Sequence, residues 1–325
     1  MQGNPRVPPY CGAMKHVQFG GTQQQVPAVV AGMMRIAEKS DAEIRSLYQA
    51  CRSVGVDFFD HADIYGFNVP GGGYHLCERR FRDALGLGSA ERGEIMLQTK
   101  TGIVDEPRAY DLSHDHIVSS VEESLRALGT DYVDVLLLHR PDALVEPEEV
   151  ARAFQHLESS GKVRMFGVSN HTPRQIDLLK TAVEQPLVVN QMQLSPVHAA
   201  MISQGLAANM YVDDAISRDG GALEHARINN ITLQAWSPVQ GPNGVFLGDP
   251  SYPELNAEID RLATTYEVTP DAIVTAWFAR HPADMQVVLG TTRPQRVLDA
   301  ASGADLTLTR AEWYALLGAA GHHLP

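Results

Sequence analysis

The sequence predicts one (β/α)8 TIM barrel of the α/β class, and three observations support this fold. Eight short apolar runs alternate with longer amphipathic stretches along the chain. The apolar runs are continuous, as expected of parallel strands that are covered on both faces. The chain has 325 residues, whereas one barrel domain needs roughly 250. An open doubly wound sheet is the alternative, but the usual dinucleotide glycine fingerprint does not open the first strand–helix unit.

The predicted strands follow from the positions of the apolar runs. In chain order they span residues 28–32, 57–62, 95–100, 132–139, 163–169, 187–193, 231–237 and 286–290. In a parallel barrel the carboxyl ends of all these strands open into one mouth. Side chains that follow the strands are therefore expected to converge there.

The predicted helices follow from apolar spacing and from capping residues. Apolar side chains recur at helical spacing in 41–54, and a second helix runs from an N-cap at Ser113 to Gly129. Thr172-Pro173 and Thr269-Pro270 each read as an N-cap followed by proline at the first helical position. Thr309 and Glu312 form a capping box that begins a C-terminal helix.

The N-terminal segment is expected to lie outside the barrel wall. Paired polar and apolar residues flank Gly20-Gly21, which predicts a hairpin within 16–30 that closes the barrel bottom. We expect a single domain over 1–325, with the barrel at about 28–303 and an N-terminal extension at 1–27.

Composition excludes several classes of function. The net charge of -13 argues against a nucleic-acid or anionic-membrane surface. No apolar run approaches the roughly 18 residues needed to span a bilayer, and residues 1–9 contain no apolar signal core. The three cysteines have no pairable or metal-type spacing, so a reducing cytoplasm is expected. No ordered carboxylates complete a metal site around the histidines, so no metal is expected.

Four polar residues lie at or just after predicted strands. Asp60 and Lys100 end two apolar runs, His139 ends a third, and Tyr65 follows Asp60 by five residues. A phenol has a pKa of about 10, and a nearby ammonium lowers it. Tyr65 is thus the candidate proton donor, with Lys100 to activate it and Asp60 to hold Lys100. His139, in its neutral form, would orient a substrate carbonyl.

Two other functions fit some of these residues. Lys100 at a strand end could form a Schiff base, as in aldolase-type lyases. The chain could also bind a cofactor tightly and report redox state with little turnover.

Several motifs resemble those of the aldo-keto reductases. They read FFDHADIYG at 58–66, TK at 99–100, LHRPD at 138–142, GKVRMFGVSN at 161–170, NQ at 190–191, AWSP at 235–238 and GTTRP at 290–294. The variants around His61 and His139 look most like a bacterial oxidoreductase branch related to the potassium-channel β-subunit group. The resemblance implies a catalytic tetrad of Asp60, Tyr65, Lys100 and His139.

The resemblance also implies a nicotinamide cofactor that lies extended across the barrel mouth. At its nicotinamide end the matching positions are Ser169, Asn170 and Gln191 for the carboxamide and Trp236 for stacking. The pyrophosphate positions are Ser237, Pro238 and Val239, and contacts from Gly32 and Met33 would come from the backbone. At the adenosine end the matching positions are Gly290, Thr292, Arg293, Arg296 and Asp299, the last standing where glutamate is common.

The activity implied is NADPH-dependent reduction of aldehydes or ketones, with Tyr65 as general acid. Arg293 and Arg296 at a helix start favour a 2′-phosphate, and hence NADPH over NADH. The expected partner is a small-molecule carbonyl compound. Neither the identity of that compound nor the oligomeric state follows from the sequence.

Overall fold

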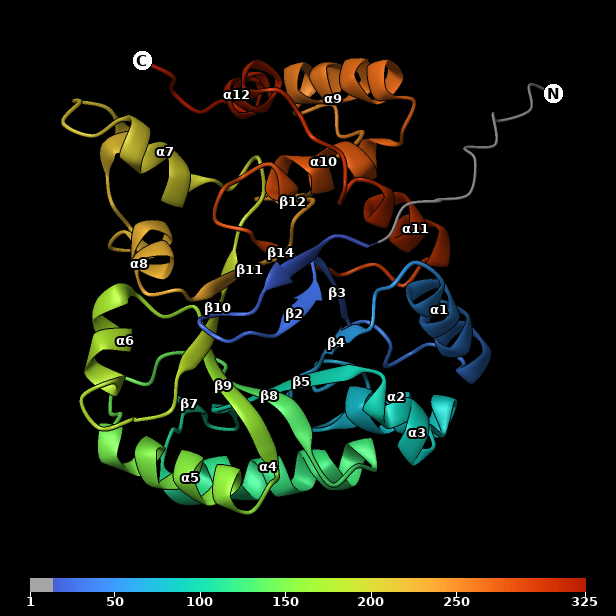
Figure 1. The fold of residues 1–325 in the computed structure, drawn as a ribbon, viewed down its shortest axis with the longest axis vertical. Helices are drawn as coiled ribbons and strands as arrows, with labels where there is room; N and C mark the ends of the chain where they lie inside the picture. Colours follow the sequence, from blue (N-terminus) through green and yellow to red (C-terminus); the bar gives the residue numbers. More distant parts are fainter. Residues whose placement is uncertain (1–13) are drawn as a thin grey trace.

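The computed structural model describes residues 14–325, so the first 13 residues of the predicted extension, Cys11 among them, lie outside the described residues. Eight parallel strands close into a barrel (Figure 1). They are β3 (Val29–Gly32), β4 (Phe58–Asp60), β5 (Met96–Thr101), β8 (Val133–Leu138), β9 (Val163–Ser169), β10 (Leu187–Gln193), β11 (Thr232–Trp236) and β14 (Gln286–Leu289). All eight predicted strands are confirmed, and the barrel closes through pairing of β14 with β3.

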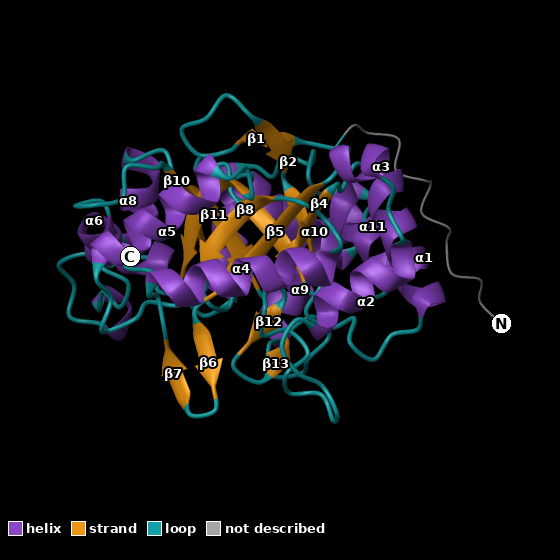
Figure 2. Ribbon diagram, turned by 90° about the horizontal axis from the view of Figure 1, so that it is seen from below, coloured by secondary structure: helices purple, strands orange, loops and turns teal. Residues whose placement is uncertain are grey.

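Helices cover the outside of the barrel, as Figure 2 shows. In chain order they are α1 (Asp41–Ser53), α2 (Leu76–Leu85), α3 (Ser89–Gly93), α4 (His114–Leu128), α5 (Pro147–Ser159), α6 (Pro173–Leu179), α7 (Ala200–Leu206), η1 (Asp213–Ala215), α8 (Ala222–Ile228), α9 (Pro253–Tyr266), α10 (Pro270–Ala279), α11 (Pro294–Ser302) and α12 (Arg310–Ala319). None of the helices within residues 14–325 is both long and apolar enough to cross a membrane.

The predicted helix ends form as expected. Ser113 accepts a hydrogen bond from the His116 backbone N–H at the start of α4, and Gly129 ends that helix in the left-handed conformation. Thr309 and Glu312 form a capping box at the start of α12. These side chains satisfy backbone groups that the first helical turn leaves without partners.

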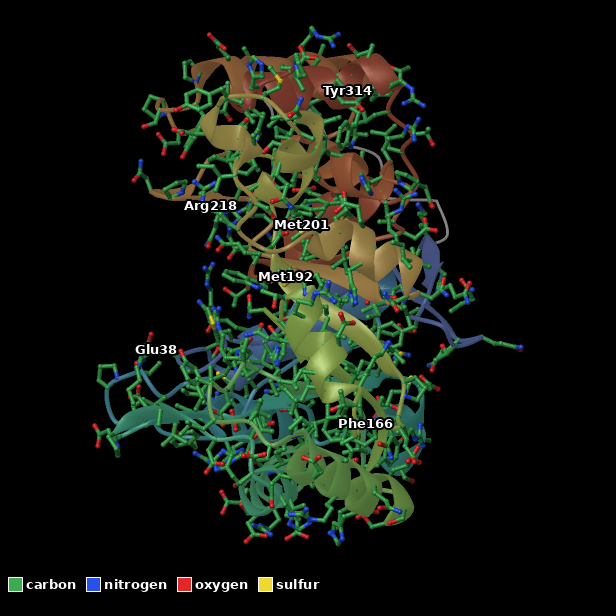
Figure 3. All side chains as sticks on the ribbon, turned by 90° about the vertical axis from the view of Figure 1, so that its left-hand side faces the viewer. Glu38, Phe166, Met192, Met201, Arg218 and Tyr314 are labelled. Atoms are coloured by element: carbon green, nitrogen blue, oxygen red, sulfur yellow. The ribbon has the colours of Figure 1, made fainter. Side chains whose placement is uncertain are left out.

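Apolar side chains fill the layer between the barrel and its helices. Phe166 of β9, labelled in Figure 3, stacks on Phe154 of α5 with ring centroids 4.1 Å apart. Trp277 of α10 stacks on Trp313 of α12 at 5.2 Å. This layer makes the barrel a rigid frame on which the loops at the strand ends are held.

The N-terminal hairpin closes one end of the barrel, as predicted. β1 (His16–Gln18) and β2 (Gln25–Pro27) pair antiparallel, and Figure 1 shows them lying across the barrel. Phe19 in the connecting turn is fully buried, with its ring 5.7 Å from that of Phe58. Gly20 has φ +57°, and a Cβ there would lie 2.7 Å from the Val188 carbonyl oxygen. Only glycine allows the turn to sit this close to the strands.

The opposite end of the barrel is open and is bordered by two small hairpins. They are β6 (Ile103–Asp105) with β7 (Arg108–Tyr110), and β12 (Gln240–Gly241) with β13 (Gly244–Val245). Figure 2 shows both of them at the end of the molecule opposite β1 and β2. The carboxyl ends of the strands therefore face an accessible mouth.

Candidate active site

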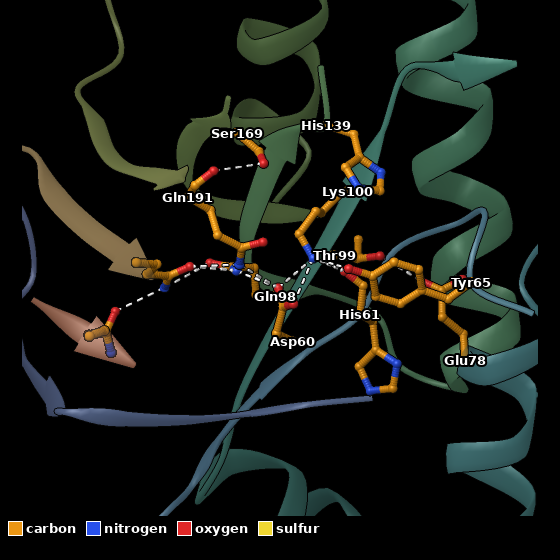
Figure 4. A network of polar contacts seen from close by, with 12 residues as sticks. Asp60, His61, Tyr65, Glu78, Gln98, Thr99, Lys100, His139, Ser169 and Gln191 are labelled. Atoms are coloured by element: carbon orange, nitrogen blue, oxygen red, sulfur yellow. Dashed lines mark hydrogen bonds and ion pairs between the residues drawn. The ribbon is translucent and has the colours of Figure 1, made fainter. Parts of the chain in front are cut away.

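The predicted tetrad meets at the open mouth (Figure 4). Lys100 on β5 donates one hydrogen bond to Asp60 on β4, over 2.7 Å, and a second to the phenol oxygen of Tyr65, over 2.9 Å. A third goes to the His61 carbonyl oxygen over 2.8 Å. The ring of His139, just after β8, lies 5.9 Å from the Tyr65 ring.

All three N–H groups of the Lys100 ammonium are thus occupied. Burial favours the neutral amine, but the Asp60 carboxylate and the Tyr65 phenol outweigh it and raise the pKa of Lys100. The side chain is fully buried and does not line the mouth. Lys100 is therefore a charged hydrogen-bond donor to Tyr65 and is poorly placed to act as a nucleophile.

Tyr65 lines the mouth and keeps its own proton. Burial raises the pKa of Tyr65 above 10, although the Lys100 ammonium opposes that rise. The sequence-based expectation of a pKa lowered by Lys100 is therefore wrong in its net direction, because burial of the phenolate costs more than one ammonium recovers. A protonated phenol is still far more acidic than an aliphatic alcohol, so it can protonate an alkoxide.

His139 is neutral, as expected. Burial lowers its pKa well below 6.5, and the Lys100 and Arg140 cations lower it further. Its Nδ1 is buried with no hydrogen-bond partner among the described residues. Because the residue lines the mouth, Nε2 is the nitrogen that can donate to a carbonyl oxygen there.

A chain of glutamines inside the barrel supports Asp60. Gln191 was predicted as a site residue, whereas Gln98, Gln234 and Gln286 were not. Gln98 and Gln191 donate to Asp60 Oδ1 over 2.6 and 3.1 Å. Both also donate to Gln234, which donates to Gln286, which donates to the Pro27 carbonyl oxygen of β2. The available signal was a glutamine in each of four predicted strands, at 95–100, 187–193, 231–237 and 286–290.

A second polar cluster anchors the loop that carries Tyr65. Glu78 of α2 accepts hydrogen bonds from Thr99 of β5 over 2.6 Å and lies 2.6 Å from the Nδ1 atom of His75. Asp63 accepts from Ser120 of α4 over 2.8 Å. Burial raises the pKa of Asp63 to about 6, while bonds from partners such as Ser120 oppose the rise.

One cavity of about 490 Å³ runs from the tetrad to the start of α11. Most of the predicted cofactor positions line it, namely Gly32, Ser169, Asn170, Gln191, Trp236, Ser237, Pro238, Val239, Gly290, Thr292, Arg293 and Arg296. Met33 does not, because its side chain is buried in the layer beneath the helices, and Met34 lines the cavity instead. Asp299 does not line it either, and its carboxylate accepts from Gln295.

The tetrad end of the cavity presents oriented amide and hydroxyl groups. The Gln191 amide nitrogen is held by Asp60 and Gln234, so its oxygen is left to accept. The Asn170 amide nitrogen donates to Ser169 Oγ over 2.7 Å, and its oxygen accepts from the Trp236 indole over 3.1 Å. This set of fixed donors and acceptors fits a primary carboxamide, and the Trp236 ring beside it offers a flat apolar wall.

The far end of the cavity carries the predicted Arg293 and Arg296, together with Asp271, which was not predicted as a site residue. Arg293 is the N-cap residue of α11. Arg296 forms an ion pair with Asp271 in the first turn of α10, over 2.5 Å from Nη2 and 3.0 Å from Nε to the same Oδ1 atom. Asp271 lines the cavity with both arginines. The guanidiniums fit a phosphate group.

No metal centre accompanies these residues in the part of the chain that the structure describes. Within residues 14–325, no group of three or more His, Cys, Asp or Glu side chains is arranged to hold an ion.

Comparison with known proteins places the chain among oxidoreductases. The model of the Aldo/keto reductase family matches residues 28–319. The uncharacterized oxidoreductase YcsN of Bacillus subtilis is 35% identical, covering 93% of this chain and 97% of its own. A 6-dehydroglucose reductase of Agrobacterium fabrum is 34% identical, and the match covers 90% of this chain and 93% of that protein. A probable voltage-gated potassium channel subunit beta of Oryza sativa is more distant, at 27% identity, and the match covers 81% of this chain and 82% of that protein.

Solved structures share the same fold. The crystal structure of a Bombyx mori aldo-keto reductase in complex with NADP matches with a TM-score of 0.70 at 20% identity, covering 95% of this chain and 94% of its own. The thermostable aldo-keto reductase Tm1743 matches with a TM-score of 0.73 at 22% identity, and the match covers 94% of this chain and 100% of that one. Both support the barrel architecture.

Proposed function

Because the chain belongs to the aldo/keto reductase family, we propose that it reduces aldehydes or ketones to alcohols with NADPH. The observation that carries the proposal is the placement of Tyr65. Its phenol oxygen accepts from Lys100 over 2.9 Å while the side chain lines the cavity. The phenol proton is therefore free to face a substrate oxygen.

Each member of the tetrad has a distinct role in this proposal, and that of Asp60 is to hold the Lys100 ammonium in place. The nicotinamide cofactor supplies a hydride when bound. Tyr65 donates its proton to the carbonyl oxygen as negative charge develops there, and Lys100 stabilises the phenolate that remains. His139 donates from Nε2 to the same oxygen and orients the carbonyl. Fixed donors aimed at developing charge supply a large part of enzymatic rate enhancement.

The cavity supports a nicotinamide dinucleotide as the cofactor. Gln191, Asn170 and Ser169 would hold the carboxamide, and Trp236 would pack on the ring. Ser237 and the hairpin that follows it would border the pyrophosphate. Arg293 and Arg296 would hold a 2′-phosphate, which is the reason for proposing NADPH ahead of NADH.

We propose a polar carbonyl compound as the substrate. Arg140 lines the cavity directly after His139 and has no ion-pair partner among the described residues. A free guanidinium there would bind a hydroxyl or carboxylate group of the substrate. The relative from Agrobacterium fabrum is named a 6-dehydroglucose reductase, which makes a sugar aldehyde the first compound to test.

We further propose one domain working in a reducing compartment. The family match spans most of the chain, over residues 28–319. Cys51 and Cys77 are free and buried. Burial raises the pKa of Cys51 to about 12 and that of Cys77 to about 11, which keeps both thiols unreactive.

The test measures binding and turnover separately. NADPH and NADH are titrated by the fluorescence of the protein, and NADPH oxidation is then followed with a panel of sugar, aromatic and aliphatic carbonyl compounds. Binding with turnover supports the reductase. Tight binding without turnover favours the redox-sensing alternative, and binding of neither nucleotide contradicts both. A lysine adduct trapped by borohydride would instead support the Schiff-base lyase. The burial and positive charge of Lys100 argue against that function.

A further inference from the structure

Arg296 at the far end of the cavity is held by an acid. Asp271 accepts three hydrogen bonds from Arg296, and the side chains of the two residues are only 19% and 18% exposed. The two residues come from different helices, α10 and α11. Both line the cavity, so the pair belongs to its wall as well as to the contact between the helices.

This pair changes the charge that a 2′-phosphate would meet. Arg293 and Arg296 contribute two positive charges, but Asp271 offsets one of them at hydrogen-bond distance. A third guanidinium, that of Arg35, lines the same cavity and donates to the Gly290 carbonyl oxygen over 3.2 Å. Asp271 therefore offsets one of three positive charges, and the one it offsets is that of Arg296.

The two ribose chemistries respond to this arrangement in opposite ways. A phosphate carries between one and two negative charges near neutrality, so it is repelled by the Asp271 carboxylate and competes with it for the Arg296 N–H groups. A ribose 2′-hydroxyl is neutral and can donate a hydrogen bond to a carboxylate. Asp271 thus disfavours the phosphorylated nucleotide and accepts the unphosphorylated one.

We propose that Asp271 is a specificity-determining residue, which lowers the preference for NADPH and lets the enzyme also use NADH. The proposal rests on the proposed function, because it concerns the same nucleotide site. It deepens that function by naming the group that sets the ratio of the two cofactors.

The experiment measures binding of nucleotide fragments to the full-length protein, without turnover. Calorimetry gives the dissociation constants of 2′,5′-ADP and 5′-AMP, and of NADP+ and NAD+, for the wild type and for Asp271→Asn. We expect the variant to bind 2′,5′-ADP on the order of tenfold more tightly, with 5′-AMP changed by less than about twofold. Asp260→Asn, an exposed change of the same charge on α9, is the matched control and should alter neither constant.

Two further variants keep the result interpretable. Arg296→Gln should abolish most of the preference for 2′,5′-ADP over 5′-AMP, because it removes the cation that Asp271 holds. Asp271→Ser replaces the asparagine variant if thermal unfolding shows that the latter is not folded.

The outcomes separate this inference from the proposed function. If wild-type protein binds NADP+ or NAD+ but Asp271→Asn leaves the ratio of 2′,5′-ADP to 5′-AMP affinity unchanged, Asp271 only ties α10 to α11 and the inference is overturned. If the wild type binds neither dinucleotide, the proposed function fails and the inference fails with it.

Discussion

The Nζ atom of Lys100 lies 2.9 Å from the Oη atom of Tyr65 and donates a hydrogen bond to it. One lone pair of the phenol oxygen therefore accepts a hydrogen bond from the barrel interior, and the phenol proton can point into the cavity. The other two N–H groups of Lys100 are held by Asp60 and by the His61 carbonyl. The ammonium cannot turn away from Tyr65 without losing these bonds.

Replacing Tyr65 by phenylalanine should remove reduction and leave cofactor binding intact. The ring is retained, but the proton donor is lost, so kcat should fall by about 10²–10⁴-fold. NADPH consumption and NADPH titration are the two measurements. Tyr74→Phe is the control, because Tyr74 lies on the same loop but does not line the cavity. Near-normal turnover by the Tyr65 variant would contradict the assignment.

The rate of reduction should be constant between about pH 6 and pH 9. Reduction needs a protonated Tyr65, whose pKa is raised above 10 by burial, and a neutral His139, whose pKa is lowered well below 6.5 by burial. Neither group titrates in this interval, and activity should fall only above it, as Tyr65 ionises. The measurement is kcat/KM for reduction against pH. A midpoint near pH 7 would show that one of these directions is wrong.

Breaking the glutamine chain at its two ends should separate stability from catalysis. Gln98→Met and Gln286→Met each leave buried partners without hydrogen bonds and should each lower the free energy of unfolding by about 1–3 kcal/mol. Gln98 contacts Asp60 directly, whereas Gln286 contacts Gln234 and Pro27. Only Gln98→Met should also lower kcat. Urea unfolding and steady-state kinetics measure the two effects, and equal losses of kcat would argue against a role for Gln98 in positioning Asp60.

Arg140 should discriminate between polar and apolar carbonyl compounds. Arg140→Leu removes a free guanidinium from the cavity wall, so KM for a hydroxylated or carboxylated aldehyde should rise by about 10–100-fold. KM for an apolar aldehyde should change little. Arg174→Leu, whose side chain is 94% exposed on α6, serves as the control. A uniform effect on both substrate types would assign Arg140 a structural role instead.

Asp63 should make the protein less stable as pH rises through the weakly acidic range. Burial raises its pKa from 3.8 to about 6 in the folded protein. The folded state then binds more protons than the unfolded state between these values, so the free energy of unfolding falls as pH rises from about 4 to 6, by roughly 2–3 kcal/mol.

Asp63→Asn should remove this contribution. Its amide can still bond to the Ser120 hydroxyl, which both donates and accepts. Unfolding measured in urea at several pH values should show a flatter pH dependence than in the wild type. The exposed Asp131→Asn variant should keep the wild-type slope, and an unchanged slope in Asp63→Asn would refute the raised pKa.

The barrel and the tetrad could be predicted because both depend on local pattern and one topological rule. Continuous apolar runs identify the strands, and parallel strands in a closed barrel bring their carboxyl ends together. Asp60, Lys100 and His139 end such runs, so their convergence followed without knowledge of any contact. The hairpin around Gly20 was also visible, because its strands and turn are adjacent in the chain.

The parts that could not be predicted depend on partners far apart in the chain. Gln98 and Gln234 are separated by 136 positions, and nothing near either residue identifies the other. The net direction of the Tyr65 pKa depends on how completely the ring is buried, which a list of neighbouring charges does not contain.

By itself the sequence determined the barrel, the family and the four residues at its mouth, since strand periodicity and motif order are local properties. Only the tertiary structure decided which charges are paired. Asp271 and Arg296 are 25 positions apart on successive helices, and packing of α10 against α11 brings them together. Electrostatic interaction depends on separation in space and on burial, so the balance of charge around the cavity follows from the fold and not from composition.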